Sequence, residues 1–281
     1  MSVSERIRAA YEAACLAEIE ALKPGNVHRF ADGHRMTAAQ FLASARASAP
    51  VLADSSLSVG RRTLAAVRAT RAAVGTNTNL GIILLCAPLA RAAEMDDTDL
   101  RAALARALAG MDVADSAPVF EAIVLASPGG LGSSPSHDVR EAPRVTVVEA
   151  MRAASGRDMI ARQYATDFRD VFETGVAAHR KAEGRGLDGM WPTVFTYLAF
   201  LARFPDSHVA RKHGVPAAEA LAREAAAVLS ETERMHDEAA RIGKLMDFDR
   251  RLKAQSLNPG TSADLTVATL FVRGLRSNLH N

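Results

Sequence analysis

The sequence predicts an all-α protein, folded as a single compact multi-helix domain over residues 1–281. Apolar residues make up 48% of the chain and aromatic residues only 5%, so the core must be built mainly from alanine, leucine and valine, which suit closely packed helices. Apolar positions recur every three or four residues along most of the chain. No stretch alternates apolar and polar residues between hairpin turns, as a β-strand would.

The first half of the sequence contains capping signals and apolar repeats that indicate six helices. Ser2 with Glu5, and Thr37 with Gln40, have the spacing of a capping box at a helix start. The first helix must end near Pro24, which lacks the backbone N–H that a continuing helix needs. The expected ranges are 2–22, 37–52, 59–74, 79–94, 98–110 and 115–126.

The second half starts with the longest segment that has no helical pattern, "ASPGGLGSSPSHDVREAPR", in which prolines and glycines rule out a continuous helix. Helical patterns resume over 146–180 and break at "KAEGRGLDG". Pro192 and Pro216 each suit the first turn of a further helix. The last helix is expected at "NPGTSADLTVATLF", with Thr261 or Ser262 as its N-cap.

Composition excludes several functional classes. The formal charge of +2 and the pI near 8.7 are too mild to favour a nucleic-acid or membrane partner. Cys15 and Cys86 lie in apolar helical patterns, which is typical of buried thiols in a reducing compartment. The first twenty residues lack the apolar run of a signal peptide, and no apolar run approaches the roughly 20 residues that span a bilayer. We therefore expect a soluble, cytoplasmic protein.

Familiar catalytic and nucleotide-binding motifs are missing: there is no Walker A loop, GxGxxG, GxSxG, CxxC or HExxH sequence. Four turns rich in glycine, asparagine and proline adjoin helix ends instead: "KPGNV", "TNTNLG", "PGGLG" and "NPGTSADL". In "TNTNLG", Asn77 and Asn79 precede an apolar helix whose free N–H groups would suit a phosphate or ribose. Asn79 as a simple N-cap is the alternative, and it leaves Asn77 and Gly81 without a role.

Three carboxylates have two interpretations each. Glu18 shares the apolar side of the first helix, so it is either a functional carboxylate or one partner of a salt bridge to an arginine. Asp138 follows the glycine-rich segment and either binds a divalent cation or holds a turn. Asp264 lies in the first turn of the last helix, where the helix dipole also favours a plain capping carboxylate.

Two basic segments are candidates for phosphate contacts. In "RDMIARQY", Arg157, Asp158 and Arg162 lie within about a turn and a half of helix and either clamp a phosphate or form a solvated face. In "FPDSHVARKHG", Asp206 precedes two adjacent cations, Arg211 and Lys212. The second segment is the stronger local candidate for a polyphosphate contact.

Taken in order, "LKPGNVHRF", "TNTNLGIILLCAPLA", "PGGLG…DV", "RDMIARQY", "PDSHVARKHG" and "NPGTSADLTVATLFV" resemble the triphosphoribosyl-dephospho-CoA synthase family, from about Glu18 to Val272. This resemblance implies an all-helical, soluble enzyme. The best-known members make the prosthetic-group precursor of citrate lyase and malonate decarboxylase from ATP and 3′-dephospho-CoA, releasing adenine. "NTNLG" and "ARKHG" stand where those members read "NTHKG" and "HRGG", so the chain resembles a shorter branch that also occurs in methanogens and methylotrophs.

The resemblance implies displacement at the anomeric carbon of ribose, through a transition state that resembles an oxocarbenium ion. Such a reaction needs a carboxylate near the acceptor hydroxyl, an acid for the departing base and cations for the triphosphate. The implied catalytic residues are Glu18, Asp206 and Asp264. The implied Mg²⁺ ligands are Asp138, Asp206 and Asp264. The implied nucleotide and phosphate contacts are Lys23, Gly25, Asn26, Asn77, Asn79, Gly81, Arg162, Arg211, Lys212 and Asn258.

The acceptor stays open at this point. Partners expected from the resemblance are ATP and a small coenzyme-like acceptor, with no nucleic acid and no membrane, and a homodimer is compatible with the sequence. One alternative is a ligase, kinase or hydrolase of one-carbon coenzyme biosynthesis, in the tetrahydromethanopterin or methanofuran routes. Another is a helical binding protein without catalysis. Free adenine as a product would separate the transferase from both.

Overall fold

The computed structural model describes residues 1–95, 97–128 and 137–277. Within these ranges the chain forms fourteen α-helices and one π-helical segment, and no strand, which confirms the all-α prediction. The helices are α1 (Val3–Glu20), α2 (Ala38–Leu52), α3 (Val59–Val74), α4 (Leu80–Ala93), α5 (Leu100–Ala109), α6 (Val113–Ala126), α7 (Val147–Ala154), α8 (Met159–Ala165), the π-helical η1 (Val171–Gly175), α9 (Val176–Gly184), α10 (Trp191–Arg203), α11 (Ser207–His213), α12 (Val215–Arg234), α13 (Glu238–Ala254) and α14 (Gly260–Ser277).

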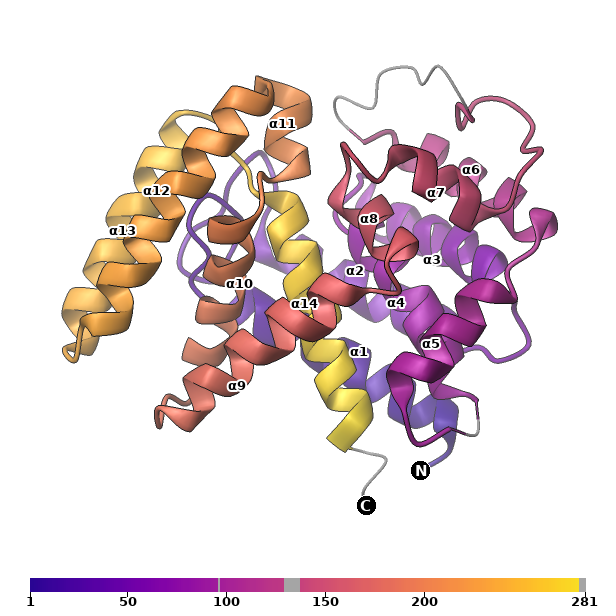
Figure 1. Ribbon diagram of the computed structural model, residues 1–281, viewed down its shortest axis with the longest axis horizontal. Helices are drawn as coiled ribbons and strands as arrows, with labels where there is room; N and C mark the ends of the chain where they lie inside the picture. The colour runs from indigo at the N-terminus through magenta and orange to yellow at the C-terminus, as the bar shows by residue number, and fades with distance from the viewer. Residues whose placement is uncertain (96, 129–136, 278–281) are drawn as a thin grey trace.

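Two central helices, α1 and α14, separate two groups of helices (Figure 1). Helices α2 to α8 lie on one side, and α9 to α13 lie on the other. Each side has its own cluster of buried apolar side chains. Helix α14 belongs to both, since Ala263 packs in the second cluster while Leu265 and the buried residues after it pack in the first. The start of α14 therefore lies where the two groups of helices meet.

The predicted capping boxes are present at α1 and α2. The side chains of Ser2 and Thr37 accept the backbone N–H groups of Glu5 and Gln40. The side chains of Glu5 and Gln40 in turn accept the backbone N–H groups of Ser2 and Thr37. These bonds satisfy N–H groups that a helix start would otherwise leave unpaired. Helix α4 is apolar on almost all sides and is buried accordingly, as expected for a helix covered all round by others.

Two predicted helix boundaries are wrong. The expected helical region 146–180 is divided into α7, α8, η1 and the first part of α9, because the Asp158 side chain caps a new helix and because Asp167 and Phe168 adopt positive φ angles of 49° and 55°. The last helix begins at Gly260, so Thr261 and Ser262 lie inside it rather than at its N-cap. Their hydroxyls contact α11 instead.

Both cysteines are buried free thiols, as predicted. Among the described residues, no helix has the length and apolar character needed to span a bilayer. Most of the predicted "PGGLG" turn lies outside the described residues, at 129–132.

Candidate active site

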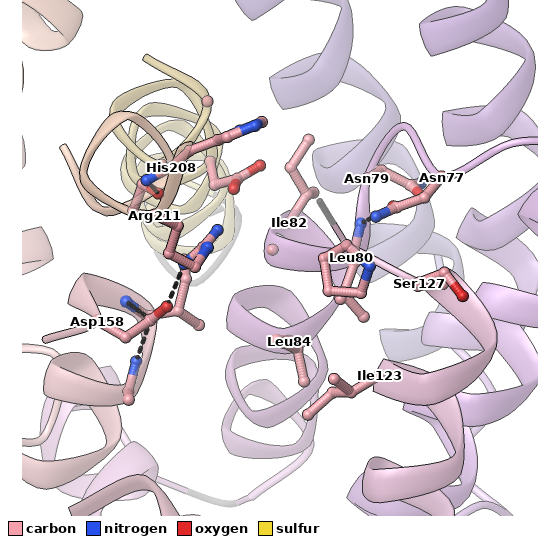
Figure 2. Close-up of a pocket in the computed structure, with 18 of the residues that line it drawn as sticks. Asn77, Asn79, Leu80, Ile82, Leu84, Ile123, Ser127, Asp158, His208 and Arg211 are labelled. Atoms are coloured by element: carbon pink, nitrogen blue, oxygen red, sulfur yellow. Dashed lines mark hydrogen bonds and ion pairs between the residues drawn. The ribbon is translucent and has the colours of Figure 1, made fainter. Parts of the chain in front are cut away.

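A cavity of about 780 Å³ lies between the two groups of helices. Helix α11 and the start of α14 form one wall, and the α3–α4 loop, the start of α4 and the end of α6 form the other (Figure 2). Leu84, Phe120 and Ile123 give part of its surface an apolar character. A cavity of this size, with apolar patches and a few polar groups, is typical of a site for a small organic ligand.

Most of the site residues predicted from the sequence line this one cavity. They are Glu18, Asn26, Asn77, Asn79, Gly81, Asp138, Arg211, Lys212, Asn258 and Asp264. The lining does not include Lys23, Gly25, Arg162 or Asp206. The structure thus brings together residues that lie more than 200 positions apart in the chain, while their individual roles stay predictions.

Asp264 is the carboxylate with the most unusual surroundings. It lines the cavity and makes no hydrogen bond or ion pair with any residue that the structure describes. Burial raises its pKa well above the usual aspartate range, and the nearby charges of Asp206 and Glu18 raise the pKa further. A carboxyl group with a raised pKa in a cavity can give or take a proton near neutral pH.

Gly81, in the first turn of α4, lies directly against this carboxyl group. A β-carbon at Gly81 would overlap Oδ2 of Asp264. Gly81 is therefore needed because only a residue without a side chain leaves room for the Asp264 carboxyl group. The alternative interpretation, in which Asn79 is a simple N-cap, gave Gly81 no role.

We therefore expect Gly81→Ala to displace the Asp264 carboxyl group, to slow turnover by at least tenfold and to lower stability by about 1–3 kcal/mol, the usual effect of overpacking. Gly243→Ala is a matched control, because a β-carbon there meets nothing within 4 Å and α13 should gain about 0.5–1 kcal/mol from it. Steady-state kinetics and thermal unfolding check both variants. Equal behaviour of the two variants would contradict the assigned contact.

The start of α4 has unpaired N–H groups beside the cavity. Asn77 caps this helix, since its Oδ1 accepts the N–H of Leu80 at 3.1 Å. Asn79 occupies the N-cap position but its side chain makes no capping bond; its Nδ2 donates to Ser48 at 3.4 Å. Within the described chain, the N–H groups of Gly81 and Ile82 have no acceptor. Such groups suit an anionic ligand atom.

Glu18 does form a salt bridge, but with a lysine rather than the predicted arginine. Its Oε1 lies 2.5 Å from Nζ of Lys23, and both side chains are buried. Lys23 also donates to the backbone carbonyl of Val27 at 2.6 Å. Burial raises the pKa of Glu18 and lowers that of Lys23, and the opposite charge of each partner counteracts the shift in the other. The Lys23 ammonium thus pairs with Glu18 and does not line the cavity. The sequence predicted instead that it would contact phosphate.

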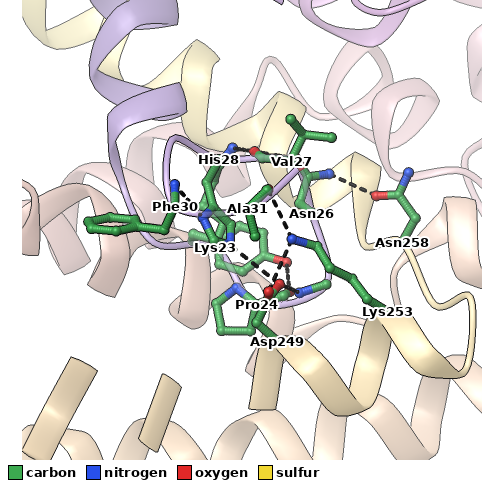
Figure 3. A network of polar contacts seen from close by, with 12 residues as sticks. Lys23, Pro24, Asn26, Val27, His28, Phe30, Ala31, Asp249, Lys253 and Asn258 are labelled. Atoms are coloured by element: carbon green, nitrogen blue, oxygen red, sulfur yellow. Dashed lines mark hydrogen bonds and ion pairs between the residues drawn. The ribbon is translucent and has the colours of Figure 1, made fainter. Parts of the chain in front are cut away.

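The "KPGNV" turn, which follows the first helix and contains Lys23, contacts Asp249 and Asn258 (Figure 3). Gly25 has a φ of +82°, and a β-carbon there would lie 2.9 Å from both Leu252 and Pro259. Its N–H donates to Oδ1 of Asp249 at 2.8 Å. Asn26 Nδ2 donates to Oδ1 of Asn258 at 2.8 Å. Gly25 therefore lets the chain pack against α13, while the two asparagines reach the cavity.

Two further predicted residues have structural partners away from the cavity lining. Oδ1 of Asp206 accepts the N–H groups of His208 and Val209, and Oδ2 accepts the N–H and hydroxyl of Ser262. This carboxylate joins α11 to α14. Arg162 pairs with Asp170 at 2.8 Å. Neither arrangement supports the metal, base or phosphate roles that were expected of Asp206 and Arg162.

Helix α11 contributes Arg211 and Lys212 to the cavity lining, and these two residues form its cationic wall. Arg211 Nη1 lies 2.5 Å from Oδ2 of Asp158, whose Oδ1 caps α8. Lys212 is exposed at the cavity and forms no ion pair among the residues described. His208, one turn earlier, also lines the cavity (Figure 2). His208 was not predicted from the sequence, although it lies three and four positions before the two cations, a spacing that places all three side chains on one side of a helix.

Three comparisons bear on this site. Residues 4–281 match the family described as ATP:dephospho-CoA triphosphoribosyl transferase. A crystal structure from Archaeoglobus fulgidus, of a protein provisionally described as a triphosphoribosyl-dephospho-CoA synthase, is similar with a TM-score of 0.66 and 25% identity, over 84% of this chain and 97% of that one. No curated protein matches the sequence.

Proposed function

The chain belongs to the ATP:dephospho-CoA triphosphoribosyl transferase family, and we propose that its cavity transfers the triphosphoribosyl group of ATP to a hydroxyl of 3′-dephospho-CoA or a related acceptor. The bond between ribose C1′ and adenine breaks, and the acceptor oxygen bonds to C1′. The proton of the acceptor hydroxyl is transferred to the departing adenine. The observation that carries this proposal is the Asp264 carboxyl group, which has no partner among the described residues and lies against Gly81 at the start of α4.

The two cavity carboxylates would divide the chemistry. Lys23 stabilises the charged form of Glu18, so Glu18 supplies a fixed negative charge that offsets the positive charge developing at the sugar. Asp264 makes no ion pair with a described residue and has a strongly raised pKa, although the charge of Arg211 lowers it in part; it would therefore transfer the proton between the acceptor hydroxyl and the departing base. When the surroundings push the pKa values of two carboxyl groups in one site apart, the two groups usually have different catalytic roles.

Phosphate groups would lie on the cationic wall. Arg211 and Lys212 line the cavity and supply two positive charges, and the free N–H groups of Gly81 and Ile82 add neutral donors on the opposite side. Asn26 and Asn258, joined by one hydrogen bond, would orient ribose or base through their remaining amide groups.

Mg²⁺ would enter the cavity with the phosphates of ATP. The described residues include no cluster of three or more His, Cys, Asp or Glu side chains suited to a metal, but Mg²⁺ needs only one or two carboxylates in addition to phosphate and water oxygens. Asp138 lines the cavity and would hold the ion, which leaves Asp264 available for proton transfer. The ion would neutralise charge on the triphosphate.

Product analysis tests the reaction. The purified protein, incubated with ATP, Mg²⁺ and 3′-dephospho-CoA, is expected to release adenine in proportion to acceptor consumed, as measured by chromatography. Formation of ADP or AMP instead would indicate a kinase or ligase, and no turnover together with no ATP binding would indicate a binding protein. Glu18→Gln should lower the adenine yield, whereas Glu20→Gln, an exposed carboxylate on the same helix, should not.

A further inference from the structure

Helix α11 presents two nitrogen atoms that lack hydrogen-bond partners. Nε2 of His208 and Nε of Arg211 are both enclosed and unpaired within the part of the chain that the structure describes. Both side chains line the cavity, and their spacing of three residues places them on one face of the helix. Enclosed polar atoms in native proteins almost always have partners. Two exceptions on one cavity wall indicate that a ligand supplies the missing acceptors.

The chain leaves room for the His208 ring. A β-carbon at Gly260 would lie 2.6 Å from Nδ1 of His208, and the φ of Gly260 is not in the left-handed region. The glycine is therefore required by the imidazole rather than by the backbone. The His208 N–H is fixed by Asp206 at 2.9 Å and by Thr261 at 3.2 Å, so the start of the helix holds the side chain against the cavity.

The charges around the ring are mainly positive. Burial lowers the pKa of His208 to about 3, and the nearby positive charges of Lys212 and Arg211 lower it as well. The imidazole is thus neutral at physiological pH and keeps one N–H donor without adding to the repulsion. Asp158 offsets part of the positive charge through its pair with Arg211. An anionic group is the ligand that these surroundings favour.

We propose that His208 binds the phosphate chain of a nucleotide substrate as a neutral donor beside Arg211 and Lys212. The identity of that nucleotide rests on the proposed function, but the phosphate contact does not. The triphosphate of ATP and the diphosphate of dephospho-CoA share this chemistry, and the experiment separates them.

Calorimetry with inorganic tripolyphosphate and with pyrophosphate tests the contact without any turnover. His208→Ala is expected to weaken binding by roughly tenfold to a hundredfold, the range for a lost hydrogen bond to a charged group, while His208→Gln keeps a donor and most of the affinity. His236→Gln, at an exposed position outside the cavity lining, is the control. A larger loss for tripolyphosphate, together with a raised KM for ATP alone, assigns the site to ATP; the reverse pattern assigns it to the acceptor.

A double-variant cycle tests the geometry. Gly260→Ala should displace the imidazole and weaken tripolyphosphate binding, but it should add nothing in a His208→Ala background, where the obstructing ring is gone. Unchanged binding in folded His208→Ala, or a Gly260→Ala effect that persists without the ring, overturns the proposal. Loss of phosphate binding without any adenine release would support His208 and contradict the proposed function.

Discussion

The Asp264→Asn variant is expected to release adenine roughly 10²- to 10⁴-fold more slowly, which is the usual contribution of a positioned acid or base. The amide fills nearly the same space beside Gly81 but cannot exchange a proton. Binding of ATP should change much less than turnover, since Asp264 is proposed to act on the proton rather than on the phosphates. Steady-state kinetics and calorimetry on the same preparation separate the two effects.

The same change is expected to stabilise the folded protein at neutral pH. The raised pKa means that folded Asp264 binds its proton more tightly than the unfolded chain does, so wild-type stability falls as pH rises from the ordinary aspartate pKa to the folded value. Asp264→Asn removes that loss, because the amide does not ionise. The stability difference between variant and wild type should therefore be small near pH 3 and largest at neutral or higher pH.

Thermal unfolding across this pH range checks the prediction. Asp247→Asn is the matched control, because Asp247 is an exposed carboxylate in a surface pair with Arg250, and its effect on both stability and turnover should be small. If Asp264→Asn kept full turnover, the proton-transfer role would be wrong. If its stability gain were the same at all pH values, the raised pKa would be wrong.

The Lys23→Met variant is expected to show the largest loss of stability. It leaves the buried Glu18 carboxylate without its cation, and breaking a buried ion pair from one side typically costs about 3–5 kcal/mol. The hydrogen bond to the Val27 carbonyl is lost as well. Turnover should fall too, because Glu18 would take up a proton and lose the negative charge that is proposed to act on the sugar. Urea unfolding and adenine release measure the two effects.

A double variant separates folding from catalysis. Glu18→Gln with Lys23→Met removes both charges, so most of the lost stability should return, while turnover stays low because no carboxylate remains at position 18. Recovery of activity along with stability would show that the pair is structural only. Lys244→Met, which removes a surface pair with Glu231, should change stability by less than about 1 kcal/mol.

Sequence patterns predicted the helices well where local signals decide them. The capping boxes at Ser2 and Thr37 act within a few residues, so they are visible in the sequence. The division of 146–180 was not predictable from periodicity, because a side-chain cap at Asp158 and two positive φ angles interrupt an otherwise suitable apolar repeat. The start of α14 was missed because Ser262 has a distant partner, Asp206.

The candidate site was predictable as a set of turns but not as a set of contacts. Spacing placed Asn77, Gly81 and Asp264 next to helix starts, and all three reach the cavity. Spacing could not reveal that Lys23 forms an ion pair with Glu18, or that Asp206 accepts three backbone N–H groups and the hydroxyl of Ser262. These facts depend on which helices pack together in three dimensions, and a residue type alone does not distinguish a cation that meets substrate from one that neutralises a buried acid.

The overlap between a β-carbon at position 81 and the carboxyl group of Asp264 predicts that the two positions change together among homologues. A lineage that acquires alanine or a larger residue at 81 must shorten or move the residue at 264, and any such exchange removes the proposed proton carrier. The two substitutions should therefore travel together among homologues. In homologues that have both substitutions, the fold can be retained while the reaction changes or is lost. The residues at positions 81 and 264 would then identify family members that no longer catalyse the proposed reaction.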